Sequence, residues 1–190
     1  KWIGIYTVKT SKKPELELTK EEKEFLKTHK LKCMITNNWS PFYFESKNGL
    51  DGIGIDFWKL ISKKANIDYE CTQTGTFSNI LNGIKNKSLD LTISTAMTPN
   101  RLKYSIFSES YISYPIAIAT KIDKNFISKT AYLRNKKVAV GKGYSAYKLV
   151  VAQYPEINFI QVKDTNEALN LVSKGDAYAA VDILPVLSYK

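Results

Sequence analysis

The chain has 190 residues, 44% of them hydrophobic, and a formal net charge of +10. This length can bury one large core or two modest ones, and the composition excludes a disordered or fibrous protein. The lysines are spread along the chain and accompany no nucleic-acid-binding motif, so we expect a solvated positive surface and no nucleic-acid partner. No run approaches the ~20 consecutive apolar residues that a membrane-spanning helix needs.

Residue types that bind metals are scarce. The single histidine, His29, and the two cysteines, Cys33 and Cys71, fit no metal-ligand spacing and no disulfide framework. We therefore expect no metal and no cofactor. The two cysteines fall on predicted neighbouring strands, where buried thiols are the expectation and a cross-strand disulfide stays open in an oxidising compartment.

Predicted helices and strands alternate in the first half of the chain. Thr19 and Glu22 are spaced as a capping box, which predicts a helix over residues 20–29. The periodicity then predicts, in order, a strand over 31–36, a helix over 52–66, a strand over 67–71, a helix over 78–87 and a strand over 89–93. Strands joined through helices are expected to be parallel, because a tight turn cannot connect a parallel pair.

Two of these helices carry a stripe that we expect to face a core. The stripe of the helix over 52–66 is Phe57, Leu60, Ile61 and Lys64, and that of the helix over 78–87 is Ile80, Leu81 and Ile84. Asp56 lies in the first turn of the earlier helix, where an acid offsets the helix dipole. We prefer that role to a catalytic one.

The same alternation begins again after Tyr111. An extended apolar segment over 113–121 is followed by a strand over 138–140, a helix over 145–153, a strand over 159–162, a helix over 164–174 and a strand over 178–183. Asp164 and Glu167 predict a second capping box, and Gly175 ends that helix. Two α/β units joined by a crossing segment predict a cleft where the carboxyl ends of their strands meet.

Several motifs occur in an order that resembles a known family. They are Leu18-Thr19-Lys20-Glu21-Glu22, Trp39-Ser40-Pro41-Phe42-Tyr43-Phe44, Gly52-Ile53-Gly54-Ile55-Asp56, Met97-Thr98-Pro99-Asn100-Arg101, residues 107–111, Lys142-Gly143-Tyr144 and residues 175–182. Over about residues 19–190 the chain is similar to the type II periplasmic solute-binding fold, family-3 amino-acid-binding type. It most resembles the Venus-flytrap sensor domains of bacterial membrane histidine kinases.

The resemblance implies a two-lobed, periplasmic-binding-protein-like α/β fold with parallel-rich sheets flanked by helices. We expect a linker or the tail of a preceding domain over residues 1–18, lobe 1 over 19–112, and a crossing strand with lobe 2 over 113–190. In such folds a further helix and a strand return to lobe 1. We expect that C-terminal portion to be absent from this sequence.

Arg101 is the leading candidate for a ligand-binding residue. Its guanidinium offers a planar fork that matches a carboxylate, whereas the alternative role is a surface ion pair. The resemblance implies that this arginine holds the α-carboxylate of a ligand. It also implies that Asp182, on the last strand, faces the α-ammonium group, so that the pair would match a zwitterion. The alternative for Asp182 is a solvated acid or one paired with a lysine.

Three residues near Arg101 are further candidates. Ser94 and the backbone at Ala96 would donate hydrogen bonds to a carboxylate, and Thr98 would either do so or cap the helix that begins at Pro99. Families of this kind usually place Ser or Thr where this chain has Ala96. We therefore expect one carboxylate hydrogen bond to be missing or to come from water.

Aromatic side chains and one helix start complete the predicted site. Trp39 and Tyr43 follow a strand and are expected to line the cleft, with Phe77 as a further wall and Phe42 as packing. Tyr144 is expected to close over the ligand. Ser145 opens a helix whose free amides form an anion site, or it acts as a simple N-cap.

The sequence therefore predicts an extracytoplasmic sensor domain that closes on a small zwitterion, expected to be an amino acid, and signals across the membrane. The expected partners are this small ligand and a membrane segment outside the sequence, and a homodimer stays open. We expect a periplasmic or extracytoplasmic domain of an inner-membrane-anchored protein. The alternatives are a solute-binding protein of an importer, an enzyme resembling cyclohexadienyl dehydratase or a murein-cleaving transglycosylase, and an interaction domain without a ligand. Without an evident acid-base pair, we expect no enzyme.

Overall fold

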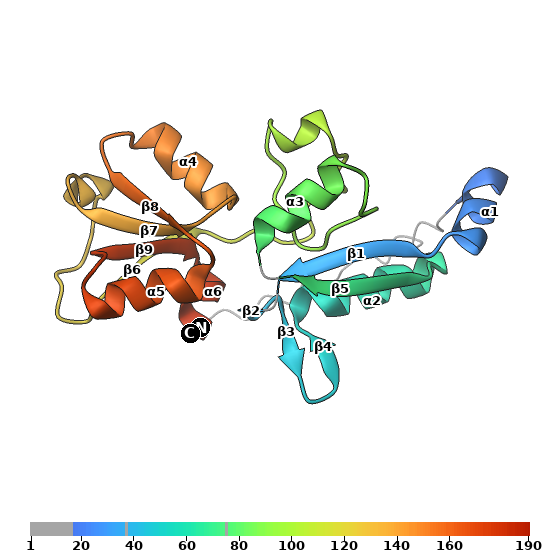
Figure 1. Cartoon of the computed structure of the whole chain (residues 1–190), viewed down its shortest axis with the longest axis horizontal. Helices are drawn as coiled ribbons and strands as arrows, with labels where there is room; N and C mark the ends of the chain where they lie inside the picture. The colour runs from blue at the N-terminus through green and yellow to red at the C-terminus, as the bar shows by residue number, and fades with distance from the viewer. Residues whose placement is uncertain (1–16, 37, 75) are drawn as a thin grey trace, which may run out of the picture.

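A computed structural model of the chain describes residues 17–36, 38–74 and 76–190, which form two lobes (Figure 1). The predicted linker over residues 1–18 lies almost wholly outside the described residues. Within those residues, no helix combines the length and the apolar character that crossing a membrane requires.

The described residues of lobe 1 include three α-helices and five short strands. They are α1 (Lys20–Thr28), β1 (Leu31–Thr36), β2 (Asn38–Trp39), β3 (Tyr43–Ser46), β4 (Gly49–Asp51), α2 (Ile53–Ala65), β5 (Tyr69–Thr74) and α3 (Phe77–Lys85). The predicted capping box is present, because the Thr19 side chain accepts from the amide of Glu22 and the Glu22 carboxylate accepts from the amide of Thr19. Strands β1 and β5 run parallel, as expected.

A disulfide joins these two strands. Cys33 and Cys71 are register partners with their Cα atoms 4.4 Å apart, within the range that such a bond requires. The expectation of buried thiols is therefore wrong, and the alternative that the sequence left open is the one found.

The prediction of a strand over residues 89–93 is also wrong. This segment makes a single bridge, between Leu91 and Cys33. The described residues of this segment after Leu91 make no further bridge, and the chain turns at Ser94, which has a left-handed φ of 55°. The Asp90 carboxylate instead accepts a hydrogen bond from the amide of Lys32 at the edge of the sheet.

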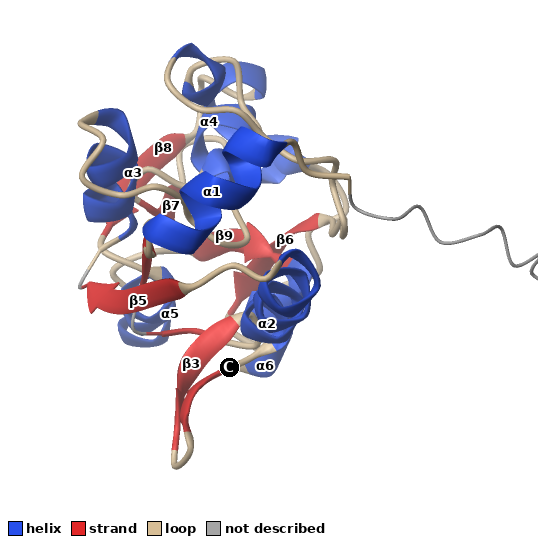
Figure 2. Cartoon of the chain, turned by 90° about the vertical axis from the view of Figure 1, so that its right-hand side faces the viewer, coloured by secondary structure: helices blue, strands red, loops and turns tan. Residues whose placement is uncertain are grey.

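Residues 38–51 form a small antiparallel sheet in the order β2-β3-β4, which sequence patterning missed. Its strands have two to four residues, too few to show an alternation. The β3–β4 hairpin projects away from the rest of lobe 1 in both ribbon views (Figures 1 and 2).

Helix α2 presents a different face to the core than its apolar stripe predicts. Leu60 and Ile61 are 52% and 44% exposed, and the buried residues are Gly54, Ile55 and Ser62. The helix approaches the β3 segment through Gly54, where a Cβ atom would lie 3.2 Å from the carbonyl oxygen of Phe42. Ile55 is buried in the core of lobe 1, and Ile53 and Trp58 pack against it, so the packed face carries apolar side chains that lie outside the predicted stripe.

Helix α3 is oriented as predicted, with Ile80 fully buried and Leu81 and Ile84 partly buried. Together with α2 it borders a groove of about 900 Å³ on lobe 1. The groove is lined mainly by apolar side chains, among them Phe57, Ile61, Leu81, Ile84, Leu89, Leu91, Leu102 and Ile106.

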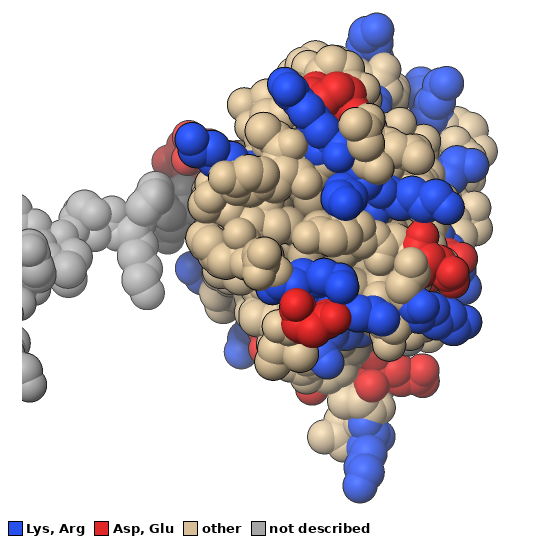
Figure 3. All heavy atoms as spheres, turned by 90° about the vertical axis from the view of Figure 1, so that its left-hand side faces the viewer, with Lys and Arg blue, Asp and Glu red and all other residues tan. Residues whose placement is uncertain are grey.

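Lobe 2 contains one four-stranded sheet. Its elements are β6 (Ile116–Thr120), a 3-10 turn (Thr130–Leu133), β7 (Lys137–Gly141), α4 (Ser145–Gln153), β8 (Asn158–Val162), α5 (Thr165–Lys174) and β9 (Ala179–Ile183). The strand order is β6-β9-β7-β8, with β7 parallel to both of its neighbours and β6 antiparallel to β9. On the outer face of this lobe, Lys and Arg are scattered among Asp and Glu, as a solvated surface requires (Figure 3).

Helix α5 begins and ends as predicted, but one of the two hydrogen bonds of the predicted capping box is absent. Asp164 accepts from the amide of Glu167, whereas the Glu167 carboxylate accepts from Lys163 and not from Asp164. Gly175 then ends the helix in a left-handed conformation with φ of 87°.

Two chain segments cross between the lobes side by side. The first leads into β6, the second leaves β9, and the amide of Leu184 donates to the carbonyl of Pro115 at 2.9 Å. The second crossing continues as α6 (Leu184–Tyr189), which the sequence did not predict. Val186 of α6 is fully buried in the core of lobe 1, where Cys33 and Ile35 also lie. The described residues therefore contain a first step of the return to lobe 1.

Candidate ligand-binding cleft

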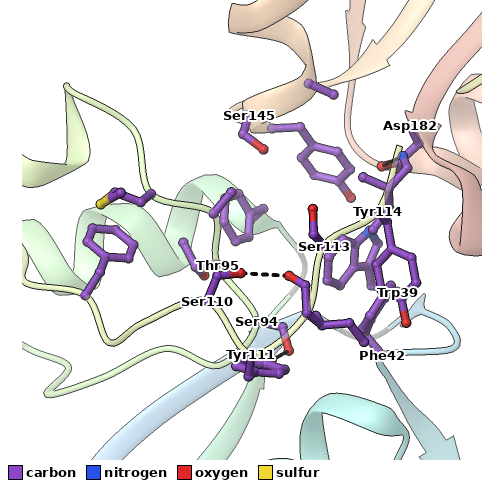
Figure 4. A pocket seen from close by; sticks show the side chains of 18 of the residues that line it. Trp39, Phe42, Ser94, Thr95, Ser110, Tyr111, Ser113, Tyr114, Ser145 and Asp182 are labelled. Carbon is purple, nitrogen blue, oxygen red and sulfur yellow. Dashed lines mark hydrogen bonds between the residues drawn. The ribbon is translucent and has the colours of Figure 1, made fainter. Parts of the chain in front are cut away.

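A cavity of about 480 Å³ lies between the lobes, with lining residues from both. Nine of the ten predicted site residues line it: Trp39, Tyr43, Phe77, Ser94, Ala96, Arg101, Tyr144, Ser145 and Asp182. Figure 4 shows Ser145 and Asp182 on one side of it and Ser94 and Tyr111 on the other.

The lobe 1 wall of the cavity is aromatic. The Trp39 ring packs 4.6 Å from that of Phe42 and 5.2 Å from that of Tyr43, measured between centroids. Phe42 and Tyr43 are almost fully buried, and burial raises the pKa of the Tyr43 hydroxyl. Phe42 serves as packing, as expected, and it also lines the cavity.

The Trp39 indole N–H is buried and has no hydrogen-bond partner among the residues that the structure describes. A buried donor without a partner is costly, so each such group requires an explanation; the Trp58 indole is a second case, and it lies outside the cavity. The Trp39 donor belongs to a residue that lines the cavity.

Arg101 lies in a 3-10 turn (Arg101–Lys103) and is only 4% exposed, so the surface ion pair considered for it is wrong. Its Nη1 donates to the carbonyl of Ala96 at 2.6 Å, and its Nη2 donates to the carbonyl of Gly143 at 2.9 Å. The guanidinium carbon lies 5.1 Å from the centroid of the Phe77 ring, which favours the positive charge. Burial lowers the pKa of this guanidinium.

Thr98 does not line the cavity. Its hydroxyl accepts a hydrogen bond from the amide of Arg101 at 3.4 Å, but the 3-10 turn begins at Arg101 and has Asn100 at its N-cap, so the predicted helix start at Pro99 is not found. Ser94 does line the cavity, and its hydroxyl is hydrogen-bonded to that of Tyr111 at 2.6 Å. Ala96 contributes the carbonyl that holds Arg101.

Asp182 lies at the end of β9 and is 2% exposed, so it is not a solvated acid. It accepts from the Thr165 hydroxyl and from the amide of Ile183, the latter at 2.7 Å. Among the described residues, no Lys, Arg or His nitrogen lies within 4.0 Å of it. Burial raises the pKa of this carboxyl, and the bonds from Thr165 and Ile183 and the nearby Trp39 indole oppose that rise.

Tyr144 and Ser145 come from lobe 2. Helix α4 begins at Ser145 and has Tyr144 at its N-cap with no side-chain cap, so the simple N-cap considered for Ser145 is wrong. Tyr144 is buried, and its ring meets that of Phe77 from the other lobe edge-on, with centroids 5.7 Å apart. Burial raises the pKa of its hydroxyl.

Sequence reasoning missed the contribution of the first crossing segment. Ser110, Tyr111, Ser113 and Tyr114 all line the cavity, and the Tyr114 ring packs 5.5 Å from that of Phe42 (Figure 4). The alternation of Ser and Tyr in this segment was the available signal. Two of these hydroxyls are hydrogen-bonded, that of Ser110 to the carbonyl of Ile112 and that of Tyr111 to the Ser94 hydroxyl.

Comparison with protein families decides what kind of protein has this fold and cleft. Residues 31–182 match the model of the bacterial extracellular solute-binding proteins, family 3. The chain belongs to this family. The predicted two-lobed fold and the predicted resemblance to solute-binding and sensor domains are thereby confirmed.

Three curated relatives illustrate the range of this family-3 domain. Virulence sensor protein BvgS of Bordetella pertussis is 22% identical over 170 residues, which cover 88% of this chain and 14% of that protein. Sensor protein EvgS of Escherichia coli K12 is 24% identical over 182 residues, which cover 95% and 15%. Arginine-binding extracellular protein ArtP of Bacillus subtilis is 27% identical over 154 residues, which cover 80% and 59%. The chain thus spans about one seventh of the length of the two sensor proteins.

Solved structures share the fold. The periplasmic VFT2 domain of B. pertussis BvgS matches with a TM-score of 0.80 at 20% identity, over 91% of this chain and 74% of that one. The ancestral amino acid-binding protein AncCDT-1, a precursor of cyclohexadienyl dehydratase, matches with 0.76 at 27% identity, over 88% and 75%. An ancestral arginine-binding protein bound to glutamine matches with 0.75 at 27%, over 84% and 72%.

Proposed function

We propose that this domain binds a small zwitterion, an amino acid, in the cleft and acts as an extracytoplasmic sensor that signals across a membrane. The observation that carries the proposal is the position of two charged residues. Arg101 of lobe 1 and Asp182 of lobe 2 are both buried and both line the same cavity. A ligand with a carboxylate and an ammonium group would connect the lobes through them.

The environment of Asp182 favours a cation. A buried carboxylate is costly unless a positive group neutralises it, and no basic side chain does so among the described residues. The aromatic faces of Trp39 and Tyr43 would add attraction for an ammonium group.

Arg101 can still take a carboxylate. It commits one N–H of each terminal nitrogen to a backbone carbonyl, and its other N–H groups, which make no hydrogen bond within the described part of the chain, could donate to a ligand. Ala96 supplies no hydroxyl, so the amide groups of this segment and the Ser94 hydroxyl would complete the carboxylate site.

Similarity to the sensor proteins BvgS and EvgS, over 88% and 95% of this chain, supports the sensory role. Similarity to the arginine-binding protein ArtP supports a second candidate, a solute-binding protein of an amino-acid importer. Both candidates use the same cleft and the same ligand chemistry. We propose no catalysed reaction for either.

Isothermal titration calorimetry against the twenty amino acids tests the binding step. We expect one or more of them to bind, and we expect Arg101→Ala and Asp182→Asn each to weaken binding at least ~30-fold. That factor corresponds to about 2 kcal/mol, a low figure for removing one partner of a buried charge pair. Lys103→Ala is the matched control, because Lys103 is exposed in the same 3-10 turn and does not line the cleft.

An absence of heat with every amino acid and with simple carboxylates would contradict the proposal. Binding that Asp182→Asn leaves unchanged would contradict the zwitterion pairing.

A further inference from the structure

The turn between β7 and α4 connects the two lobes directly. Gly143 of this turn has φ of 82°, a conformation that favours glycine. A Cβ atom there would lie 3.4 Å from the Ser78 hydroxyl and 3.5 Å from Leu81, both on helix α3 of lobe 1. The turn of lobe 2 is therefore in close contact with the N-terminal half of a lobe 1 helix.

Arg101 joins the lobes at the same place. It bonds to the carbonyl of Ala96 in its own lobe and to the carbonyl of Gly143 in the other. Both bonds are charge-assisted because the guanidinium is positively charged, and its burial shields them from water.

Two rings complete the contact. The Phe77 ring lies against the guanidinium on one side and meets the edge of the Tyr144 ring on another. Phe77 and Tyr144 belong to different lobes and share a buried cluster with Ile80.

We infer that these groups form a clasp that holds the lobes closed without the help of a ligand. The term clasp refers below to four residues: Arg101, Gly143, Phe77 and Tyr144. Every bond in it is made by protein atoms, so the inference does not depend on which ligand the cleft takes. Arg101 also lines the cleft, so a carboxylate bound there would act on the guanidinium that fastens the lobes.

Small-angle X-ray scattering and hydrogen exchange on protein refolded without amino acids test the clasp. Arg101→Met keeps an unbranched apolar side chain and removes the guanidinium with its donors. We expect this variant to have a larger radius of gyration than the wild type. We also expect amides in residues 77–81 and 141–146 to exchange roughly tenfold faster or more, as the loss of a hydrogen bond to a charged group predicts.

Lys103→Met is the control, because it makes the same type of change in the same 3-10 turn at an exposed position. It should leave scattering and exchange at the wild-type values. Tyr144→Ala is a second variant that keeps the Arg101 bond and removes the ring contact, and it should open the lobes in the same direction. If circular dichroism shows that Arg101→Met is unfolded, Tyr144→Ala becomes the variant that tests the clasp.

The inference is overturned if wild-type protein without amino acids scatters as an open form, or if a folded Arg101→Met variant stays as closed as the wild type. Neither result depends on calorimetry with amino acids. A failure to bind amino acids would overturn the proposed function and leave the clasp standing.

Discussion

The Asp182 carboxyl combines burial, two hydrogen bonds and a raised pKa. In the unfolded chain the same group titrates near the ordinary value for an aspartate. Its charged form is therefore less favourable in the folded protein than in the unfolded one. This difference connects the stability of the domain to pH.

A raised folded-state pKa means that the folded protein keeps the proton when the unfolded chain has lost it. The contribution of Asp182 to stability is therefore fully present below the unfolded pKa, and it is lost as the pH rises through the folded pKa. Without ligand, we expect stability to fall over that window by at most about 1.4 kcal/mol per pH unit on account of this group.

Urea denaturation at a series of pH values checks this expectation. Asp182→Asn should flatten the dependence in that window, because the amide does not titrate. Glu109→Gln is the control, since Glu109 is an exposed acid at the rim of the same cavity. Equal pH profiles for wild type and Asp182→Asn would contradict the expected coupling.

At the scale of single residues, the sequence located the cleft better than it described the bonds within it. Arg101 and Asp182 are charged types in recognisable motifs, so their place could be predicted. The bond from Arg101 to Gly143 could not, because a backbone carbonyl carries no signal in the residue type. Ser94 and Tyr111 likewise meet only because a left-handed residue turns the chain.

Among the elements, α6 has the most unusual position. It leaves the β9 strand of lobe 2 and inserts Val186 into the core of lobe 1. The Val186 side chain is fully buried, whereas Leu184 at the start of the same helix is 48% exposed.

Val186→Ala should therefore destabilise the domain by about 1–3 kcal/mol, through lost burial and a residual cavity. Leu184→Ala should change stability by less than about 0.5 kcal/mol, as an exposed substitution does. Urea denaturation of both variants measures the difference. Similar values for the two would show that α6 does not dock in solution as the structure has it.

The elements that were predicted well are those with a clear start, stop and period. Helix α4 has the predicted limits, and α5 has a recognisable cap and a glycine stop. The predicted face of α2 was wrong because the packed face consists of Ile53, Ile55 and Trp58 together with the small residues Gly54 and Ser62, and the predicted stripe contains none of these. The strand over 89–93 was wrong because the amide of Leu89 bonds back to Gly83 at the end of α3 and only Leu91 bridges to β1, and an alternating pattern reveals neither contact.

For the molecule as a whole, the apolar surface is distributed unevenly. The groove on lobe 1 is about 900 Å³ and includes Ile61, Leu102 and Ile106, the last of which is 98% exposed. Exposed apolar surface of this kind is typical of contact sites and of segments that tend to aggregate.

We expect the chain to bind the dye bis-ANS at this groove. The double variant Ile61→Gln with Leu102→Gln should lower the fluorescence by about half or more, because it makes two of its exposed side chains polar. Ile122→Gln is the control, since Ile122 is fully exposed but lies on lobe 2 outside the groove. Equal losses from both changes would contradict a groove-specific site.

The docking of α6 has a mechanical consequence. Its start is tied to lobe 2 through β9 and to the first crossing through the bond between Leu184 and Pro115, while Val186 is anchored in lobe 1. Any rotation of one lobe against the other must therefore bend the chain at residues 183–185 and swing this helix. The orientation of this six-residue helix relative to strand β9 would therefore change with the angle between the lobes.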